Sequence, residues 1–197
     1  MIKGGEFLIT DQEAKDIFVP EEFGEDQKMM ASATKEFVEK ELDPHRERFE
    51  KKDYKLTEYC MKKAGELGLL GISVPAEYGG MGMPFNTSVL ICDKISGANG
   101  SFSTAFGAHT GIGTLPILLY GDDAQRSKYL PKLATGEWMG CYCLTEPGAG
   151  SDANSGKTKA VLTDDGKHYL ITGQKMWISN AGFADVLIVF ARIEDDK

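Results

Sequence analysis

Residues 142–152 of the chain read Tyr-Cys-Leu-Thr-Glu-Pro-Gly-Ala-Gly-Ser-Asp, an apolar strand that runs directly into a loop rich in proline and glycine. The end of such a strand offers in-plane backbone N–H and C=O groups, and Thr145 adds a hydroxyl. Gly148 and Gly150 allow backbone amides to approach an anion such as a pyrophosphate, and Ser151 can donate to the same anion. The stretch predicts a place for a flat polar ring, although many loops of this composition are mere connections.

A second informative stretch lies at 174–180 and reads Gln-Lys-Met-Trp-Ile-Ser-Asn. Its apolar centre between polar ends predicts a strand over 175–179. Side chains alternate between the two faces of a strand, so we expect Trp177 and Ser179 on one face.

Around these stretches the chain divides into a helical part and a strand-rich part, which meet at the Gly136-Glu137 turn. Apolar residues at helical spacing predict helices over 26–42, 56–67, 85–98, 101–119 and 122–133. Alternating patterns predict strands over 138–145, 156–163, 168–173, 175–179 and 185–193, with a hairpin turn at 164–167. The predicted fold class is therefore α+β: an extension over 1–25, an all-helical domain over 26–136, and the start of a small antiparallel β domain over 137–197.

The predicted helix over 101–119 is apolar on nearly every side, which is typical of a helix in an interior. Its small residues, Ala108 and the glycines at 107, 111 and 113, would let another backbone or a ligand approach closely. Each glycine costs roughly 1 kcal/mol of helix propensity relative to alanine. His109 has no acidic or nucleophilic partner nearby in sequence, so we expect a buried histidine with satisfied hydrogen bonds rather than a catalytic one.

The composition argues against several classes of function. The chain holds 22 Lys and Arg against 30 Asp and Glu, a net charge of −8, without a basic run that would suit nucleic acid. Residues 1–53 carry nine basic against fifteen acidic residues, unlike an Arg-rich presequence, and no apolar stretch reaches the roughly 18 residues of a membrane span.

The cysteines and the glycine-dense stretch 77–82 are expected to be structural. The four cysteines show no CxxC spacing, so neither a zinc site nor a disulfide framework is indicated, and we propose no metal. Cys141 and Cys143 share one face of a strand, and we expect two buried small apolar side chains rather than a redox pair. The stretch 77–82 lacks the spacing of a dinucleotide-binding loop and predicts a turn.

Taken together, the two stretches resemble the acyl-CoA dehydrogenase family. Residues 143–152 match its first signature and 175–180 match the companion signature, and the pair in this order is highly specific. The resemblance continues through 67–82 (Leu-Gly-Leu-Leu-Gly-Ile-Ser-Val-Pro-Ala-Glu-Tyr-Gly-Gly-Met-Gly) and 129–137 (Tyr-Leu-Pro-Lys-Leu-Ala-Thr-Gly-Glu), so nearly the whole chain is included. Residues 3–9 and 107–121 are similar to the very-long-chain branch, which favours a long acyl chain.

The resemblance implies that FAD binds between the β domain and a further helical domain. The flavin contacts carried over position by position are Tyr142, Leu144, Thr145, Gly150, Ser151, Trp177, Ile178 and Ser179. The first three meet the ring, Gly150 and Ser151 lie near the pyrophosphate, and the Trp177 segment flanks the reactive nitrogen. Ser151 is also the expected substrate contact, on the pantetheine or phosphate arm of CoA.

The family reaction is α,β-dehydrogenation of an acyl-CoA thioester, with electrons passing to an electron-transfer flavoprotein. The glutamate that removes the α-proton is expected beyond Lys197, so none of these 197 residues is predicted to be catalytic. Glu146 is not that base; its place in the signature suggests that it orders the loop. Resemblance further implies a homo-oligomer in β-oxidation, in a bacterial cytoplasm or, alternatively, in the mitochondrial matrix after processing.

Two alternatives stay open on the sequence. An acyl-CoA oxidase shares the pocket but passes electrons to oxygen, and a non-catalytic acyl-CoA-binding or assembly module could keep the fold. The fragment alone is expected to bind FAD weakly or not at all, and to self-associate, because a split core leaves apolar surface and a strand edge exposed.

Overall fold

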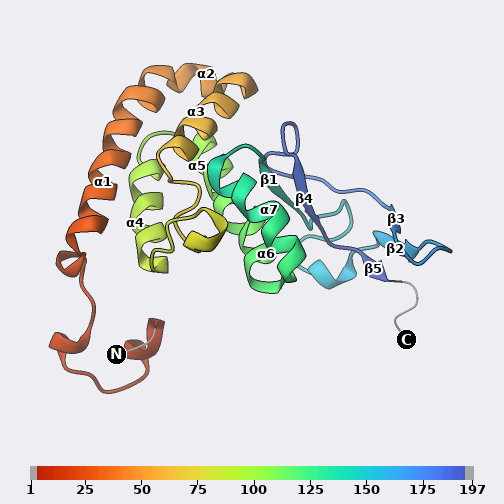
Figure 1. Cartoon of the computed structure of the whole chain (residues 1–197), viewed down its shortest axis with the longest axis horizontal. Coiled ribbons are helices and arrows are strands. Elements are labelled where there is room, and N and C mark those ends of the chain that lie inside the picture. Colours follow the sequence, from red (N-terminus) through yellow and green to blue (C-terminus); the bar gives the residue numbers. More distant parts are fainter. Residues whose placement is uncertain (1–3, 194–197) are drawn as a thin grey trace.

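The computed structural model describes residues 4–193, and Figure 1 shows a group of helices with a smaller β region beside it. The predicted α+β class, a helical domain followed by a β region, is confirmed. Residues 4–23 contain only short 3-10 turns and lie apart from the body in Figure 1. The helices are α1 (Glu25–Phe37), α2 (Arg46–Glu50), α3 (Tyr54–Glu66), α4 (Phe85–Ser96), α5 (Gly100–Gly107), α6 (Leu115–Tyr120) and α7 (Asp123–Thr135).

Local capping sets the ends of α3 and α7. The Asp53 carboxylate accepts from the Leu56 N–H at the start of α3, so this helix begins slightly earlier than its apolar stripe. Asp122 caps α7 in the same way, as the sequence predicts. Gly68 and Gly136 follow the two helices with φ of 75°, a left-handed conformation that glycine adopts without strain.

The predicted helix over 101–119 is interrupted. A π-helical turn (Ala108–Gly113) separates α5 from α6, and a similar turn (Val38–Leu42) follows α1. Each turn lies shortly before a proline, Pro116 or Pro44, which lacks an N–H and crowds the carbonyl four residues earlier. The regular α-helical hydrogen bonding is interrupted at both places, whereas α7 accommodates Pro131 within its length.

Two clusters of buried side chains form the core. The larger one lies among α1 to α5 and includes Leu42, Met61 and Phe102, none of which is exposed. The second joins α7 to the β region, because Leu130 and Leu133 pack with Val186. Through this second cluster the helical part supports the strands on which the site lies.

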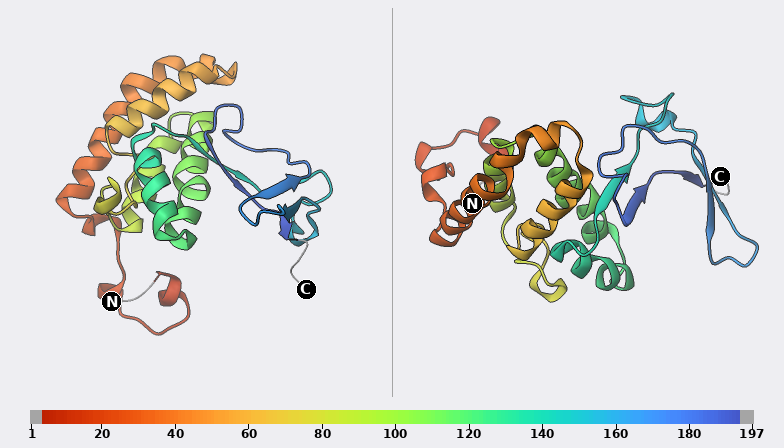
Figure 2. Two further views of the ribbon diagram at one scale, coloured as in Figure 1. Left: turned by 45° about the vertical axis from the view of Figure 1, so that its right-hand side comes forward. Right: turned by 90° about the horizontal axis from the view of Figure 1, so that it is seen from above.

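The strands are β1 (Gly140–Cys143), β2 (Lys159–Leu162), β3 (Tyr169–Thr172), β4 (Val186–Val189) and β5 (Arg192–Ile193). Antiparallel pairing was expected throughout, but it holds only for the β2–β3 hairpin; β1 pairs with β4, and β2 with β5, in parallel. The segment between β1 and β4 is long enough to carry the chain back in the same direction, which parallel pairing requires. In Figure 2 the β region extends to one side of the helices.

The predicted strand over 175–179 is wrong, because residues 173–176 and 178 have no regular structure and the chain bends at Trp177. Trp177 has a φ of 59°, which no strand residue adopts. Over residues 4–193, no helix combines the length and apolar character needed to cross a bilayer.

Candidate functional site

The two informative stretches meet in space although about thirty residues separate them. The Met176 N–H donates to the Thr145 carbonyl over 3.0 Å. One residue earlier on each segment, the Lys175 ammonium donates to the Leu144 carbonyl, also over 3.0 Å. The end of β1 is therefore joined to the Trp177 segment by one backbone and one side-chain hydrogen bond.

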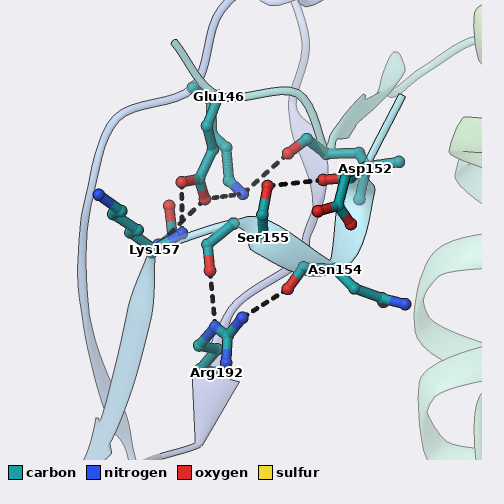
Figure 3. A network of polar contacts seen from close by, with 10 residues as sticks. Glu146, Asp152, Asn154, Ser155, Lys157 and Arg192 are labelled. Carbon is teal, nitrogen blue, oxygen red and sulfur yellow. Dashed lines mark hydrogen bonds and ion pairs between the residues drawn. The ribbon is translucent and has the colours of Figure 1, made fainter. Parts of the chain in front are cut away.

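A buried ion pair lies at this junction. The Glu146 carboxylate is 2.8 Å from the Lys175 ammonium, and only 7% of the Glu146 side chain and 14% of the Lys175 side chain are exposed. The carboxylate also accepts from the backbone N–H groups of Lys157 and Thr158, and Figure 3 shows it turned toward that backbone. The hydrogen bond from Lys175 first, and then those from the backbone, hold the pKa of Glu146 far below its ordinary range.

The Trp177 segment is fixed at its other end by Asn180. The buried Asn180 amide donates to the Ala105 carbonyl of α5 over 2.8 Å and to the Gly140 carbonyl of β1 over 3.2 Å. Between its two anchors, Trp177 is 82% exposed and adopts the left-handed conformation, which is rare for a bulky residue. Because the segment is not a strand, the predicted alternation that placed Trp177 and Ser179 on one face does not apply.

The loop after β1 folds back on itself. Glu146 and Ala149 exchange backbone hydrogen bonds of 3.0 and 3.1 Å, and Ala149 is buried. A Cβ built on Gly148 or Gly150 would meet nothing within 4 Å, so the backbone there is open to an approaching group. Ser151 follows on the exposed side of the loop.

Arg192 of β5 ties down the end of the same loop. Its guanidinium donates to the carbonyls of Gly156 and Asn154, and Figure 3 shows it reaching toward Asn154. The Ser155 hydroxyl donates to the Asp152 carbonyl over 2.8 Å. The loop that begins at Glu146 is thus held both by the buried ion pair and by the last described strand.

A cavity of about 570 Å³ lies beside the junction. Tyr142 and Leu144 line it together with Lys175 and Arg192, and the Tyr142 ring packs 4.9 Å from that of Phe190. Of the eight predicted flavin contacts, only these first two line the cavity. The other six are not part of its wall: Thr145, Gly150, Ser151, Trp177, Ile178 and Ser179.

A second, apolar cavity of about 220 Å³ lies in the helical part between α4 and the α5 region. Its wall includes Gly107 and Gly111, and a Cβ on either would meet nothing within 4 Å. Gly113 differs, because its Cβ would come within 2.9 Å of the Gly140 backbone. The small residues of this segment therefore serve two purposes: Gly113 allows close packing against β1, whereas Gly107 and Gly111 leave room in a cavity.

His109 is buried with both ring nitrogens satisfied, as predicted. Nδ1 accepts from the Gly140 N–H over 3.0 Å, so the proton is on Nε2, which donates to the Leu133 carbonyl over 2.9 Å. Burial lowers the pKa of His109 to about 4. The neutral ring joins the helical part to β1 and has no free nitrogen for catalysis.

Acidification is expected to destabilise the protein through His109. Below the unfolded-state pKa of 6.5 the unfolded chain gains a proton that the folded ring cannot accept, so stability falls as pH drops toward 4, by about 3 kcal/mol in all. Urea unfolding between pH 7 and 5 checks this. The control is His109→Gln, whose amide offers one donor and one acceptor but does not titrate; equal pH dependence in both proteins would show that His109 contributes nothing.

Two family models match the chain: the N-terminal domain of acyl-CoA dehydrogenase over residues 24–137 and the middle domain over residues 141–197. The chain belongs to the acyl-CoA dehydrogenase family. A probable acyl-CoA dehydrogenase of Bacillus subtilis (strain 168) is 49% identical over 195 residues, which cover 99% of this chain and 33% of that protein. The human mitochondrial very long-chain specific acyl-CoA dehydrogenase is 48% identical over 128 residues, 64% of this chain and 19% of that protein.

Solved structures agree with this assignment. The crystal structure of an acyl-CoA dehydrogenase from Bacillus anthracis, complexed with FAD, has a TM-score of 0.93 and 48% identity to this chain, covering 98% of it and 33% of that protein. Acyl-CoA dehydrogenases use FAD as cofactor. The chain spans a third or less of the length of the relatives named here.

Sequence reasoning missed two polar residues of the site, Lys175 and Asn180. A signal for Lys175 was present, because a lysine within an apolar segment needs a carboxylate partner if it is buried, and Glu146 lies three residues after the end of β1. No comparable signal existed for Asn180, whose two acceptors, Ala105 and Gly140, lie far from it in sequence.

Proposed function

We propose that this chain is the amino-terminal part of an FAD-dependent acyl-CoA dehydrogenase that converts an acyl-CoA thioester to the trans-2-enoyl-CoA in fatty-acid β-oxidation. The observation that supports this most is the contact between the two signature segments through the Met176 N–H and the Thr145 carbonyl. Without it, the residues carried over from the family could not meet one cofactor.

The residues at the junction fit FAD. Trp177 presents an exposed aromatic side chain for a planar ring, and Thr145 is a partly exposed residue whose carbonyl is hydrogen-bonded to the neighbouring Met176. The open backbone at Gly148 and Gly150 suits an anionic pyrophosphate. The proposed contacts are Tyr142, Leu144, Thr145, Gly150, Ser151, Trp177, Ile178 and Ser179.

The chain's own residues bind and orient in this proposal. Trp177 covers apolar ring surface and excludes water, Ser179 donates a hydrogen bond near the reactive edge, and Ser151 holds the pantetheine or phosphate arm of CoA. When bound, FAD supplies the acceptor for the β-hydride. The α-proton is taken by a carboxylate, which we propose is a glutamate beyond Lys197.

Glu146 is unsuited to that proton transfer. Its carboxylate is buried and accepts from Lys175 and from two backbone N–H groups, and its pKa is far below its ordinary range. A general base works best with a pKa near the working pH and with a lone pair facing the substrate. Glu146 fails the first condition, and Lys175 and two backbone N–H groups already occupy its carboxylate oxygens.

The apolar cavity in the helical part is the proposed place for the acyl chain. Its wall is formed by α4, by α5 with the following π turn, and by the 69–74 segment, and it includes Leu70, Phe106 and Leu115. Apolar walls favour a hydrocarbon chain through the hydrophobic effect. The missing side chains at Gly107 and Gly111 enlarge the cavity, which supports a long chain as substrate.

The full-length protein is expected to be yellow and to lose its flavin colour when an acyl-CoA is added without oxygen, because the β-hydride then reduces FAD. Anaerobic absorbance spectroscopy checks this, with free CoA as the control. A full-length protein that persistently lacks flavin would defeat the proposal.

Two other outcomes would favour the alternative functions. Rapid formation of hydrogen peroxide on turnover would favour an acyl-CoA oxidase. A coding region without a helical segment bearing a suitable glutamate would favour a binding module.

The remaining assignments follow from the same proposal. We propose an electron-transfer flavoprotein as the acceptor of electrons, and the cytoplasm of a bacterium as the location, in line with the Bacillus relatives.

A homo-oligomer is proposed because Leu170, Ile171 and Leu187 of the β region are more than half exposed, and such apolar surface favours association.

A further inference from the structure

The buried Glu146–Lys175 pair connects four parts of the β region. Lys175 donates to the Leu144 carbonyl and to Glu146, while Glu146 accepts from the backbone of Lys157 and Thr158. The pair therefore joins the end of β1, the loop after it, the segment that leads into β2, and the Trp177 segment. The buried Asn180 amide adds a second anchor at the other end of the Trp177 segment.

The backbone between the anchors is strained. Trp177 adopts a left-handed conformation that a bulky residue avoids unless its surroundings impose it. Lys175 and Met176 are hydrogen-bonded to the end of β1 on one side, and Asn180 is hydrogen-bonded to α5 and β1 on the other. Strain that is held by anchors at both ends is typical of a binding surface that is ordered before its ligand arrives.

We propose that the Glu146–Lys175 pair is a positioning device that sets the Thr145 and Trp177 segments against each other before flavin binds; this inference rests on the proposed function. Neither residue needs to touch the cofactor. The buried charges fix the arrangement of the backbone. The ammonium donates to the Leu144 carbonyl, and the carboxylate accepts from the N–H groups of Lys157 and Thr158. Glu146 and Lys175 are thus positioning residues and not catalytic ones.

The critical variant is Lys175→Met, which keeps the length of the side chain but removes its charge and its donors. In the 197-residue chain, hydrogen exchange of the Met176, Lys157 and Thr158 amides is expected to accelerate at least about tenfold, while the amides of α3 stay protected. Lys175→Arg should restore much of the protection. The matched control is Lys167→Met, because that side chain is exposed in the turn between β2 and β3.

The same variants in the full-length protein test the link to flavin by equilibrium dialysis with FAD. Lys175→Met is expected to raise the Kd for FAD roughly tenfold or more, with partial recovery in Lys175→Arg and no change in Lys167→Met. Local loss of amide protection together with weaker FAD binding supports the inference. If the full-length Lys175→Met protein binds FAD as tightly as the unmodified protein, the positioning role is overturned.

A wrong flavin assignment and a wrong positioning role give different experimental results. If the unmodified full-length protein binds no FAD, the flavin assignment falls, whatever the exchange data show. If it binds FAD while Lys175→Met leaves the three amides protected, the flavin assignment stands and only the positioning role falls. Glu146→Gln, which keeps the side-chain volume, serves as the second variant should Lys175→Met not fold.

Discussion

Leucine in place of His109 is expected to lower the free energy of unfolding by about 4 kcal/mol, because it leaves two buried backbone groups without partners at roughly 1 to 3 kcal/mol each. These groups are the Gly140 N–H and the Leu133 carbonyl, which the imidazole now bridges. Leucine fills a similar volume, so the change tests the hydrogen bonds more than the packing. Urea unfolding followed by circular dichroism measures the effect.

The variant His109→Gln is the control for that prediction. Its amide can donate to Leu133 and accept from Gly140, so it should retain much of the stability that His109→Leu loses. A loss below about 1 kcal/mol in His109→Leu would contradict the bridging role, since single hydrogen bonds at exposed sites contribute about that much. The affected groups belong to α7 and β1, so the same variant should also loosen the contact between the helical part and the strands.

Leucine in place of Gly111 is expected to reduce kcat/KM for long acyl-CoA substrates by roughly 100-fold and to leave short ones nearly unaffected, because its side chain fills the apolar cavity. Gly111 has no left-handed φ, and the space for a Cβ is open. The helical backbone should therefore gain up to about 1 kcal/mol in stability. Steady-state kinetics of the full-length protein with a series of acyl-CoA lengths measures the first effect, and thermal unfolding the second.

Gly100→Leu is the matched control, since Gly100 lies at the exposed start of α5, the helix before the π-helical turn that holds Gly111, with nothing within 4 Å of its Cβ position. It should change neither the preferred chain length nor the kinetics. The opposite outcome for Gly111→Leu, a destabilised protein with unaltered chain-length preference, would mean that this glycine serves helix packing. Gly113 already shows that role, because it lies against the Gly140 backbone.

Much of the helical part could be predicted from the sequence because its signals are local. Asp122 and Gly136 mark the ends of α7 through their own backbone geometry and hydrogen bonds. The interruption before Pro116 was missed, since the apolar pattern continues through it while the proline prevents regular hydrogen bonding. Local pattern and local backbone chemistry disagreed there, and the backbone chemistry decided the structure.

The β region was harder to predict because its pairing depends on distant residues. Only the β2–β3 hairpin, whose turn is encoded locally, has the expected antiparallel pairing. The Trp177 segment reads as a strand by alternation, yet the hydrogen bonds from Met176 to Thr145 and from Asn180 to Ala105 hold it in another conformation. That the two signature segments meet was predicted from the family resemblance, whereas the part played by Lys175 came only from the structure.

The parallel pairing of β1 with β4 affects the order in which the chain can fold. β1 begins at Gly140 and its partner begins at Val186, so ribosomal synthesis completes β1 well before β4 exists. Contacts between residues so distant in sequence form late and slowly, after the entropy of a large loop has been lost. Cys141 and Cys143 of β1 are buried in the folded protein but stay exposed to solvent during that interval. The nascent chain is then most prone to aggregate and most accessible to chaperones.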